Sequence, residues 1–510
     1  MSEQSPRVLA LQSWHDDWSG IRAVVLGLGV SGFAAADTLA ELGAHVSVVT
    51  ARASDEHKRI LQVLGIPLRE TADDQSTPPE IEGADLIIIS PGFAPHHPWS
   101  IASAQSNAVV WGDIELAWRV RDKVRAAEWL LVTGTNGKTT TTQLAAHMIA
   151  RGGARVAPVG NIGTPVLDAV RDPEGFDALV VELSSFQLHT LGTIEPLAAA
   201  LLNIDVDHVD WHGSFEQYLA AKGKVFENTK TAIIYNTADS RTLELAENAE
   251  VVDGCRAIGF GLGTPGPSNF GMVEDILVDR AFLDARAGQA LELATLEDLA
   301  LSGLASAHMT QNVLAAAALA RAFGTEPAAI RAAVRDFTLD KHRTESLGMV
   351  REVHFVDDSK ATNAHAANGS LGAFPSIIWI VGGLLKGGTI DDLLLRHAHR
   401  LRAAVVIGTE RDAIRESFTR HAPALRVLEV DEVHTGDVME SAVALAISEA
   451  AAGDTVLLAP AAASFDQFTG YAQRGEHFAA AVRRRQERAK HDPSAPNAEP
   501  GPDLGLEQGQ

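Results

Sequence analysis

Cysteine is almost absent from this 510-residue sequence, in which Cys255 stands alone. A single thiol excludes an intrachain disulfide and any metal site built from several cysteines. The opening segment, MSEQSPRVLALQSWHDDW, lacks the apolar core of a signal peptide, and no stretch of the chain approaches the length of a membrane span. We therefore expect a soluble protein of the cytoplasm.

Positive charge is also scarce, because 42 Lys and Arg residues face 66 Asp and Glu residues, for a formal net charge of −24. Nucleic acids and anionic membrane surfaces do not attract an acidic protein, so neither is an expected partner. Any anionic substrate must instead meet local Lys and Arg side chains and helix N-termini. Since 510 residues exceed what one hydrophobic core usually organises, several domains are expected.

The alternation of strand-like apolar runs with helical segments restarts three times, which predicts three α/β domains. The expected strands lie near 23–26, 45–50 and 86–90 in the first domain, near 130–133, 179–182, 199–202 and 232–235 in the second, and near 377–381, 403–407, 427–430 and 455–459 in the third. Residues 491–510 are rich in Pro, Gly and acidic residues and poor in branched apolar ones, so we expect a disordered tail there.

Deletion of residues 491–510 is expected to leave activity and melting temperature nearly unchanged, because the segment lacks the apolar residues needed to dock on a folded domain. The full-length and shortened proteins should be compared in an activity assay and a thermal melt. A large loss of either property would show that the tail packs on the body of the protein.

The most informative segment is 130–140, where an apolar run leads into a glycine-rich turn that ends in Lys-Thr and enters a helix. In such a loop, backbone N–H groups cradle phosphates, Lys138 supplies a fixed positive charge and the Thr139 hydroxyl can ligate Mg²⁺. Val132 stands where the full P-loop pattern has glycine, so the loop is a shortened variant. ATP or GTP is the predicted ligand, and the candidate binding residues are Gly134, Thr135, Asn136, Gly137, Lys138, Thr139 and Thr140.

A second glycine-rich turn, G-x-G-x-x-G at 27–32, follows the first strand and gives this domain a Rossmann-like pattern. Domains that bind NAD usually end the second strand in Asp or Glu, but here that strand ends in Thr50 and is followed by Ala51 and Arg52. Arg52 would still suit a 2′-phosphate. The turn at 90–92 should face the same crevice, because it follows a parallel strand of the same sheet. A nucleotide-like ligand that need not be a redox cofactor is therefore predicted.

Several segments after the phosphate loop carry groups suited to phosphoryl transfer. Glu182 ends an apolar strand, where a carboxylate commonly holds nucleotide-bound Mg²⁺. The segment 203–212 gathers carboxylates and imidazoles, which are compatible with a solvated acidic loop or a zinc site. Taken alone, Lys222 would be a surface helix lysine and Asn161 part of a turn.

Taken together, these segments resemble the Mur ligases, the ATP-dependent amino-acid-adding enzymes of peptidoglycan precursor synthesis, over residues 17–490. The motifs occur in the family's order: TGTNGKTT at 133–140, GNIG at 160–163, ELSSFQL at 182–188, Asp207-His208, Lys222, His308 with Asn312, His342-Arg343 and DSKATN at 358–363. DSKATN and the segment 460–468 resemble the members that add D-glutamate. Tyr471 departs from them, because a Phe is expected there, and Thr50-Ala51-Arg52 replaces their Asp-Thr-Arg.

The resemblance implies an N-terminal extension at 1–16 and three domains: a Rossmann-like domain for the UDP substrate at 17–114, a P-loop ATPase-like domain with a parallel sheet at 115–339, and a Rossmann-like domain for the amino acid at 340–490. It implies a monomer that uses ATP, D-glutamate and UDP-N-acetylmuramoyl-L-alanine, with an acyl phosphate as intermediate. Two Mg²⁺ sites are implied, one held by Thr139 and Glu182 and one by His208 and a Lys222 that carries a CO₂-derived carbamate. Lys138, His208 and Lys222 would be the catalytic residues.

The remaining site residues are also implied by the resemblance. Contacts to the UDP substrate would come from Gly29, Val30, Ser31, Arg52, Ser90, Pro91, Gly92, Asn161 and His208. Further contacts to ATP would come from Asn312, Arg343 and Asp358. The amino acid would meet Lys360, Thr362, Lys386, Ser464 and Tyr471.

Three other functions stay open from the sequence. The chain could be a Mur-type ligase for another amino acid, or an NAD(P)-dependent oxidoreductase fused to an ATPase. It could also be a non-catalytic nucleotide sensor or scaffold, which would need the phosphate loop but not the carboxylates that hold a divalent metal.

Overall fold

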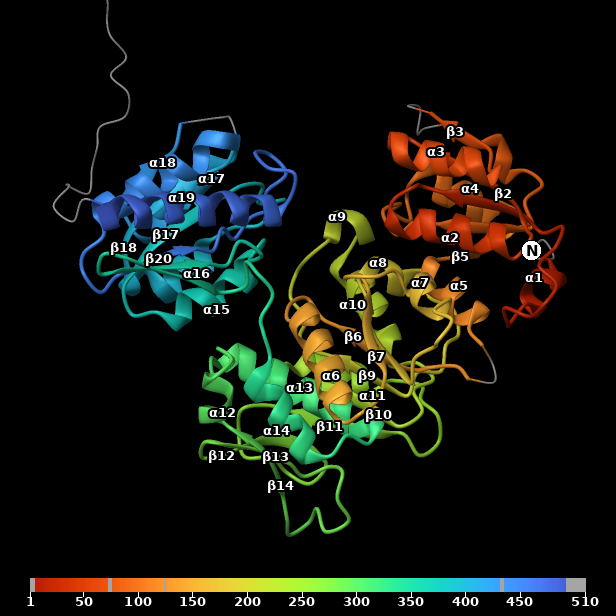
Figure 1. The fold of residues 1–510 in the computed structure, drawn as a ribbon, viewed down its shortest axis with the longest axis horizontal. Helices are drawn as coiled ribbons and strands as arrows, with labels where there is room; N and C mark the ends of the chain where they lie inside the picture. The colour runs from red at the N-terminus through yellow and green to blue at the C-terminus, as the bar shows by residue number, and fades with distance from the viewer. Residues whose placement is uncertain (1–4, 72–75, 123–124, 432–434, 492–510) are drawn as a thin grey trace, which may run out of the picture. The chain divides into compact units, whose positions relative to one another are not determined.

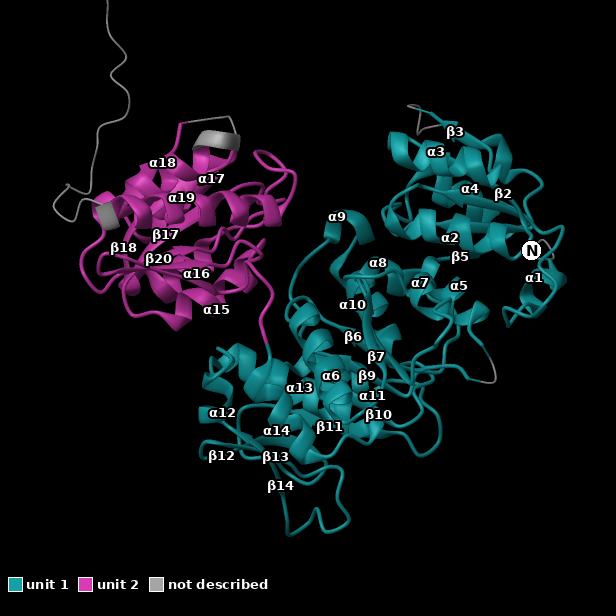
Figure 2. Ribbon diagram, viewed as in Figure 1, with its two compact units in different colours: residues 1–337 teal, residues 338–510 magenta. Residues whose placement is uncertain are grey.

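The computed structural model describes residues 5–71, 76–122, 125–431 and 435–491. The chain divides into two compact units, residues 1–337 and 338–510 (Figure 2). Three β-sheets of five, nine and six strands follow one another along the chain, the first two in unit 1 and the third in unit 2. The expectation of three successive α/β sheets is confirmed. The predicted tail lies outside the described residues except for His491, which ends the last helix.

The first sheet, in the red-to-orange part of the chain in Figure 1, is fully parallel and has the order β3-β2-β1-β4-β5. Alternate residues of its strands enter two different cores: Val25 and Ile88 pack in one, and Leu26 and Ile89 pack in the other. Helices therefore cover both faces, as in a doubly wound sheet. Its elements are α1 (Pro6–Ala10), β1 (Arg22–Leu26), α2 (Val30–Glu41), β2 (His45–Thr50), α3 (Asp55–Leu64), β3 (Leu68–Glu70), η1 (Pro79–Ile81), β4 (Leu86–Ile89), α4 (Pro98–Gln105), β5 (Val109–Trp111) and α5 (Asp113–Val120).

The second sheet has the order β14-β13-β12-β11-β10-β9-β6-β8-β7. It is parallel from β7 to β12, and β13 and β14 continue it as antiparallel strands that the sequence patterns did not indicate. Its strands are β6 (Glu128–Thr133), β7 (Val156–Gly160), β8 (Ala178–Glu182), β9 (Ala198–Leu201), β10 (Ala232–Asn236), β11 (Arg256–Phe260), β12 (Asn269–Val273), β13 (Ile276–Asp279) and β14 (Leu291–Thr295). Its helices are α6 (Lys138–Arg151), α7 (Val166–Val170), α8 (Ser185–His189), α9 (Val209–His212), α10 (Phe215–Gly223), η2 (Lys224–Phe226), α11 (Ser240–Glu247), α12 (Leu296–Ala300), α13 (Ala307–Phe323) and α14 (Pro327–Asp336).

The third sheet has the order β15-β16-β20-β17-β18-β19, with β15 and β16 antiparallel and the other pairs parallel. Val438 and Phe478 pack on one face, and Leu371 and Phe418 pack on the other, so helices cover both. Its elements are β15 (Glu345–Val350), β16 (Val353–Asp357), α15 (Ala364–Ala373), β17 (Ile377–Gly382), α16 (Asp391–His397), η3 (Ala398–Arg400), β18 (Leu401–Ile407), α17 (Arg411–His421), β19 (Arg426–Glu429), α18 (Thr435–Glu449), β20 (Thr455–Leu458) and α19 (Tyr471–His491).

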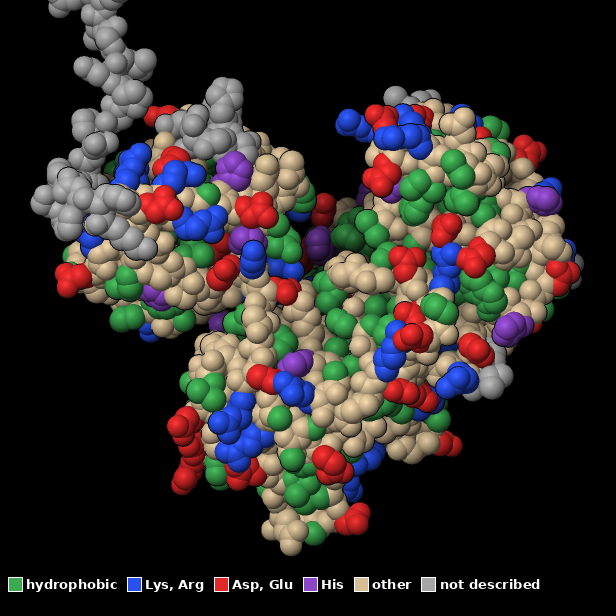
Figure 3. Space-filling view, in the orientation of Figure 1, with side chains coloured by type: hydrophobic (Ala, Val, Ile, Leu, Met, Phe, Trp, Pro, Cys, Tyr) green, Lys and Arg blue, Asp and Glu red, His purple; other side chains and the backbone are tan. Residues whose placement is uncertain are grey.

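The surface mixes charges of both signs. On the face drawn in Figure 3, Asp and Glu side chains lie interspersed with Lys and Arg. Among the residues that the structure describes, no helix is both long and apolar enough to cross a membrane.

Candidate active site

The phosphate loop lies between β6, which ends at Thr133, and α6, which begins at Lys138. Gly137 has a φ of 81°, and a Cβ added there would lie 2.4 Å from Asn312 Oδ1. Glycine is required at this position for both reasons. The same contact places Asn312, one of the predicted nucleotide ligands, directly against the loop.

The charged end of Lys138 folds over the loop itself. Its Nζ donates hydrogen bonds to the carbonyl oxygens of Gly134, at 3.0 Å, and Thr135, at 2.9 Å. Asn203, just after β9, holds the loop from the side, since its Oδ1 accepts from the backbone N–H of Asn136 at 2.8 Å. The structure therefore offers a preformed cradle for phosphate, with a cation at its rim.

Glu182 lies at the end of β8, and its backbone is paired in register with Val132 of β6. Its side chain is buried, and Oε1 accepts a hydrogen bond of 2.9 Å from Asn161 Nδ2. Its Oε2 is buried and has no hydrogen-bond partner among the described residues. Because a buried carboxylate oxygen is costly without a partner, a cation fits at this position. Asn161 is therefore more than part of a turn.

Lys222 is buried on α10, only 2% exposed, so its interpretation as a surface lysine is wrong. Its Nζ donates to Thr133 Oγ1 at 3.0 Å and to the Gly134 carbonyl oxygen at 2.7 Å, which fixes it against the phosphate loop. Burial, and after it the charge of Lys138, lowers the pKa of Lys222 well below its usual value. A neutral amine is the form that reacts with CO₂, so this environment fits a carbamate.

Tyr218 lies one helical turn before Lys222 and was not indicated by the sequence. Its hydroxyl shares a hydrogen bond of 2.8 Å with Thr135 Oγ1, and its pKa is raised by burial. The bond ties α10 to the phosphate loop at a second point. The i, i+4 spacing of Tyr218 and Lys222 was the only signal in the sequence that both face the same neighbour.

The segment 203–212 ends in the short helix α9 and carries His208 and His212. His208 has a φ of 51°, lies 3.6 Å through Nε2 from Asp207 Oδ2, and meets the Phe186 ring edge-on. His212 is buried among aromatic rings, which lowers its pKa to about 4. In the described part of the chain, no group of three His, Cys, Asp or Glu side chains suited to a metal falls within this segment. The zinc interpretation is therefore not supported.

In the first domain, the structure brings together the two turns that were expected to share a crevice. Ser90 Oγ donates to the Gly27 carbonyl oxygen at 3.2 Å, and a Cβ on Gly32 would lie 2.1 Å from that same oxygen. Buried Asp113 accepts hydrogen bonds from the side chains of Ser31 and Gln187. Gln187 lies on α8, which follows Glu182, so a polar chain links the glycine-rich turn to the strand that carries the candidate metal ligand.

The other residues predicted around the glycine-rich turn differ in exposure. Gly29, Val30, Arg52 and Gly92 are exposed, and Ser31, Ser90 and Pro91 are half-buried. The exposed positions are accessible to a ligand, and the half-buried ones support the turns.

Arg343 and Asp358 belong to unit 2, whereas the phosphate loop belongs to unit 1. Asp358 is buried and accepts hydrogen bonds from Ser370 Oγ and, at 3.2 Å, from the backbone N–H of Thr344. Burial raises the pKa of Asp358 to about 7. The carboxylate therefore fixes the turn around Arg343 within its own unit.

Replacement of Asp358 by Asn should stabilise the protein at pH 8. Between about pH 4 and pH 7 the folded protein keeps a proton on Asp358 that the unfolded chain has lost, so stability falls as pH rises through that window. Asn removes this cost, and each pKa unit is worth about 1.4 kcal/mol, so a gain of one to a few kcal/mol is expected. Urea unfolding of the wild type and the Asn variant at pH 4 and pH 8 tests this. An equal gain in the free energy of unfolding at the two pH values would contradict the prediction.

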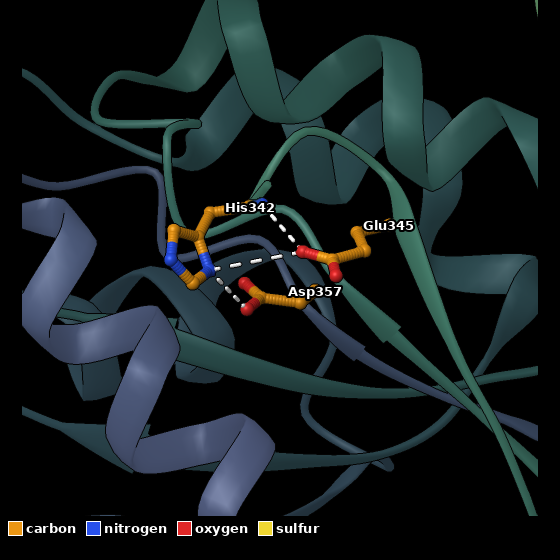
Figure 4. A group of neighbouring side chains, drawn as sticks. All are labelled: His342, Glu345 and Asp357. Atoms are coloured by element: carbon orange, nitrogen blue, oxygen red, sulfur yellow. Dashed lines mark hydrogen bonds and ion pairs between the residues drawn. The ribbon is translucent and has the colours of Figure 1, made fainter. Parts of the chain in front are cut away.

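His342, Glu345 and Asp357 form the one cluster with metal-ligand spacing among the described residues (Figure 4). His342 Nδ1 donates to Asp357 Oδ2 at 2.7 Å, and the backbone N–H of His342 donates to Glu345 Oε2 at 2.8 Å. The hydrogen bond to Asp357 raises the pKa of His342. These bonds satisfy the cluster without a metal, and we interpret it as a histidine–carboxylate pair that positions the chain before Arg343.

Four of the predicted amino-acid residues lie on loops at one end of the third sheet, and Tyr471 begins α19. The Lys360 Nζ lies 4.9 Å from the centre of the Tyr471 ring. Lys386 is exposed on a loop tied to the one that carries buried Ser464, because the Leu384 and Ala463 backbones exchange two hydrogen bonds, of 2.8 and 2.9 Å. Thr362 is half-buried just before α15.

The chain matches three family models: a MurD-like Mur ligase N-terminal domain at 21–112, a Mur ligase middle domain at 132–320 and a Mur ligase glutamate ligase domain at 342–462. It is 57% identical to a UDP-N-acetylmuramoylalanine–D-glutamate ligase of Leifsonia xyli, over 94% of this chain and 96% of that one. The chain belongs to the Mur ligase family. A protein of the same name from Streptomyces avermitilis is 50% identical, over 92% and 99% of the two chains.

The same fold occurs in solved Mur ligases. The structure of a UDP-N-acetylmuramate–alanine ligase from Thermotoga maritima superposes with a TM-score of 0.54 at 17% identity, covering 91% of this chain and 99% of that one. As a Mur ligase, the protein is an ATP-dependent enzyme that forms amide bonds. The glycine-rich turn of its first domain therefore does not indicate an oxidoreductase.

Proposed function

We propose that this Mur ligase joins D-glutamate to UDP-N-acetylmuramoyl-L-alanine at the expense of ATP, in peptidoglycan precursor synthesis. The observation that carries the proposal is the identity of 57% and 50% to two ligases of that name along nearly their whole length. The match of 342–462 to a glutamate ligase domain supports the same amino acid. Residues 17–114 would bind the UDP substrate, residues 115–339 would bind ATP, and residues 340–490 would bind the amino acid.

The chemistry begins with two anions, because the alanyl carboxylate must attack the γ-phosphorus of ATP. The backbone N–H groups of the loop and the Lys138 ammonium neutralise the phosphates while the γ-phosphoryl group moves. An acyl phosphate and ADP result. The amine of D-glutamate then attacks the acyl carbon, the nitrogen loses a proton, and phosphate leaves as the amide forms.

Two Mg²⁺ ions belong to this proposal. Thr139 and the unpartnered oxygen of Glu182 would hold one, and His208 with a carbamate on Lys222 would hold the other. Divalent cations supply charge neutralisation for the two approaching anions. The carbamate arises when the Lys222 amine adds to the carbon of CO₂ and releases a proton, which turns a potential cation into an anion.

The remaining contacts follow the same division. The UDP end of the substrate would contact Gly29, Val30, Ser31, Arg52, Ser90, Pro91 and Gly92. Its alanyl end would contact Asn161 and His208. Asn312, Arg343 and Asp358 would meet the nucleotide. Lys360, Thr362, Lys386, Ser464 and Tyr471 would surround D-glutamate. The enzyme would act as a monomer in the cytoplasm, which light scattering and cell fractionation test.

ADP formation should be far faster with D-glutamate than with L-glutamate, L-lysine or meso-diaminopimelate. The lysines Lys360 and Lys386 provide two cations for a dicarboxylic amino acid, and the relatives' name supplies the stereochemistry. The assay combines ATP, Mg²⁺ and UDP-N-acetylmuramoyl-L-alanine with each amino acid in turn. Equal turnover with L-glutamate would refute the assignment, and faster turnover with diaminopimelate would favour another Mur-type ligase.

A further inference from the structure

Arg474 is a buried cation that neither the sequence nor the proposed mechanism accounts for. It lies in the first turn of α19 and is 1% exposed. Its Nε donates to Ser359 Oγ at 3.0 Å and its Nη2 to the Ser359 carbonyl oxygen at 2.8 Å. Its Nη1 donates to the carbonyl oxygens of Ala462, at 3.1 Å, and Gly382, at 3.5 Å. Every acceptor is an uncharged oxygen.

These acceptors lie where β16, β17 and β20 end and lead into three turns, and the three strands are parallel neighbours in the third sheet. The first turn continues to Lys360, the second leads to Lys386, and the third leads to Ser464. Ser359 also donates through Oγ to the carbonyl oxygen of Tyr471 at 2.7 Å. The guanidinium thus binds the start of each of the three loops that carry Lys360 with Thr362, Lys386, and Ser464.

Among the residues that the structure describes, no carboxylate forms a hydrogen bond with Arg474. Asp466 and Asp357 attract it from a distance, without a hydrogen bond to it. Asp357 is already paired with His342, and Asp466 accepts a hydrogen bond of 2.8 Å from the backbone N–H of Thr409. Burial lowers the pKa of Arg474 to about 10, which leaves the guanidinium protonated at neutral pH.

A buried charge costs free energy unless an opposite charge compensates it, and a neutral side chain would bridge carbonyl oxygens at a lower cost. We propose that Arg474 is a positioning residue of the amino-acid site, which aligns its three turns and supplies a positive charge, hydrogen-bonded only to uncharged oxygens, that a dicarboxylic amino acid neutralises. This inference rests on the proposed function, since it concerns the same substrate. Reduced screening inside the protein lets the charge act beyond hydrogen-bond distance.

The test compares Arg474→Lys and Arg474→Gln with the wild type. Gln loses the charge, so KM for D-glutamate should rise by about tenfold or more, while KM for ATP stays within about twofold. Lys keeps the charge but not the forked hydrogen bonds, so its KM for D-glutamate should rise by no more than about threefold. Arg484→Gln is the matched control, because Arg484 lies on the same helix, is exposed and pairs with Glu440. It should change neither KM.

A second readout separates positioning from general damage. ADP released in one turnover without D-glutamate reports the acyl-phosphate step, which Arg474→Gln should retain. Equal KM increases in the Lys and Gln variants, or a loss confined to kcat, would overturn the inference. If Arg474→Gln does not fold, the Lys variant decides alone: a rise near tenfold overturns the charge role, and one within threefold supports it. Failure of the wild type to use D-glutamate would instead refute the proposed function.

Discussion

Replacement of Lys222 by alanine is expected to remove nearly all ligation while the protein stays folded. Alanine is a good helix former, so α10 should persist, although Thr133 Oγ1 and the Gly134 carbonyl oxygen lose their donor. If Lys222 carries a carbamate, the variant loses an anion that positions a metal, which is worth several kcal/mol in the transition state. We expect kcat to fall by a factor on the order of 10³.

Three comparisons make this test specific. Lys224→Ala is the matched control, because Lys224 follows on the same segment and donates only to the His189 carbonyl oxygen, at 2.9 Å. It should keep activity. Lys222→Arg should fail, because a guanidinium cannot take up CO₂ and keeps its positive charge. Added bicarbonate or a short-chain carboxylic acid should partly restore Lys222→Ala, with the small carboxylate in place of the carbamate. Full activity of Lys222→Ala without an additive would refute the metal-site proposal.

Reasoning from parallel strands predicted correctly that certain segments lie close together, whereas the roles of their side chains stay predictions. The end of β8 and the start of the phosphate loop belong to neighbouring parallel strands, so Glu182 had to lie near that loop once both strands were recognised. The same argument brought Ser90 to the glycine-rich turn of the first domain. Such predictions succeed because strand ends at one edge of a sheet converge whatever the side chains between them.

The sequence did not predict the contacts made by helices in the same way. Lys222 and Arg474 are charged residues with the local sequence of an exposed helix, and only tertiary packing buries them against strand-end turns. The antiparallel strands β13 and β14 were missed because their short runs lack strict alternation of buried and exposed residues. The hydrogen bond from Asn161 to Glu182 joins the ends of the neighbouring parallel strands β7 and β8, and β7 was not among the strands that the sequence indicated.

Replacement of Glu182 by glutamine should weaken the binding of catalytic Mg²⁺ more than it weakens the fold. Gln can still accept the hydrogen bond from Asn161 Nδ2 through its amide oxygen, but the unpartnered Oε2 becomes an amide nitrogen that cannot ligate a cation. The Mg²⁺ concentration for half-maximal rate should rise, and kcat/KM for D-glutamate at saturating ATP should fall by about 10²–10³-fold. A Mg²⁺ titration of the initial rate measures the first quantity, and initial rates at varied D-glutamate measure the second.

The matched control for this test is Glu174→Gln, since Glu174 is exposed and its nearest charged partner, Arg155, lies 3.5 Å away. That variant loses the same charge from the same domain and should show the wild-type Mg²⁺ titration. The melting temperature of Glu182→Gln should stay the same or rise, because the substitution removes a buried carboxylate whose second oxygen has no partner in the described part of the chain. A lower melting temperature together with an unchanged Mg²⁺ titration would mean that Glu182 serves the fold through Asn161 rather than a metal ion.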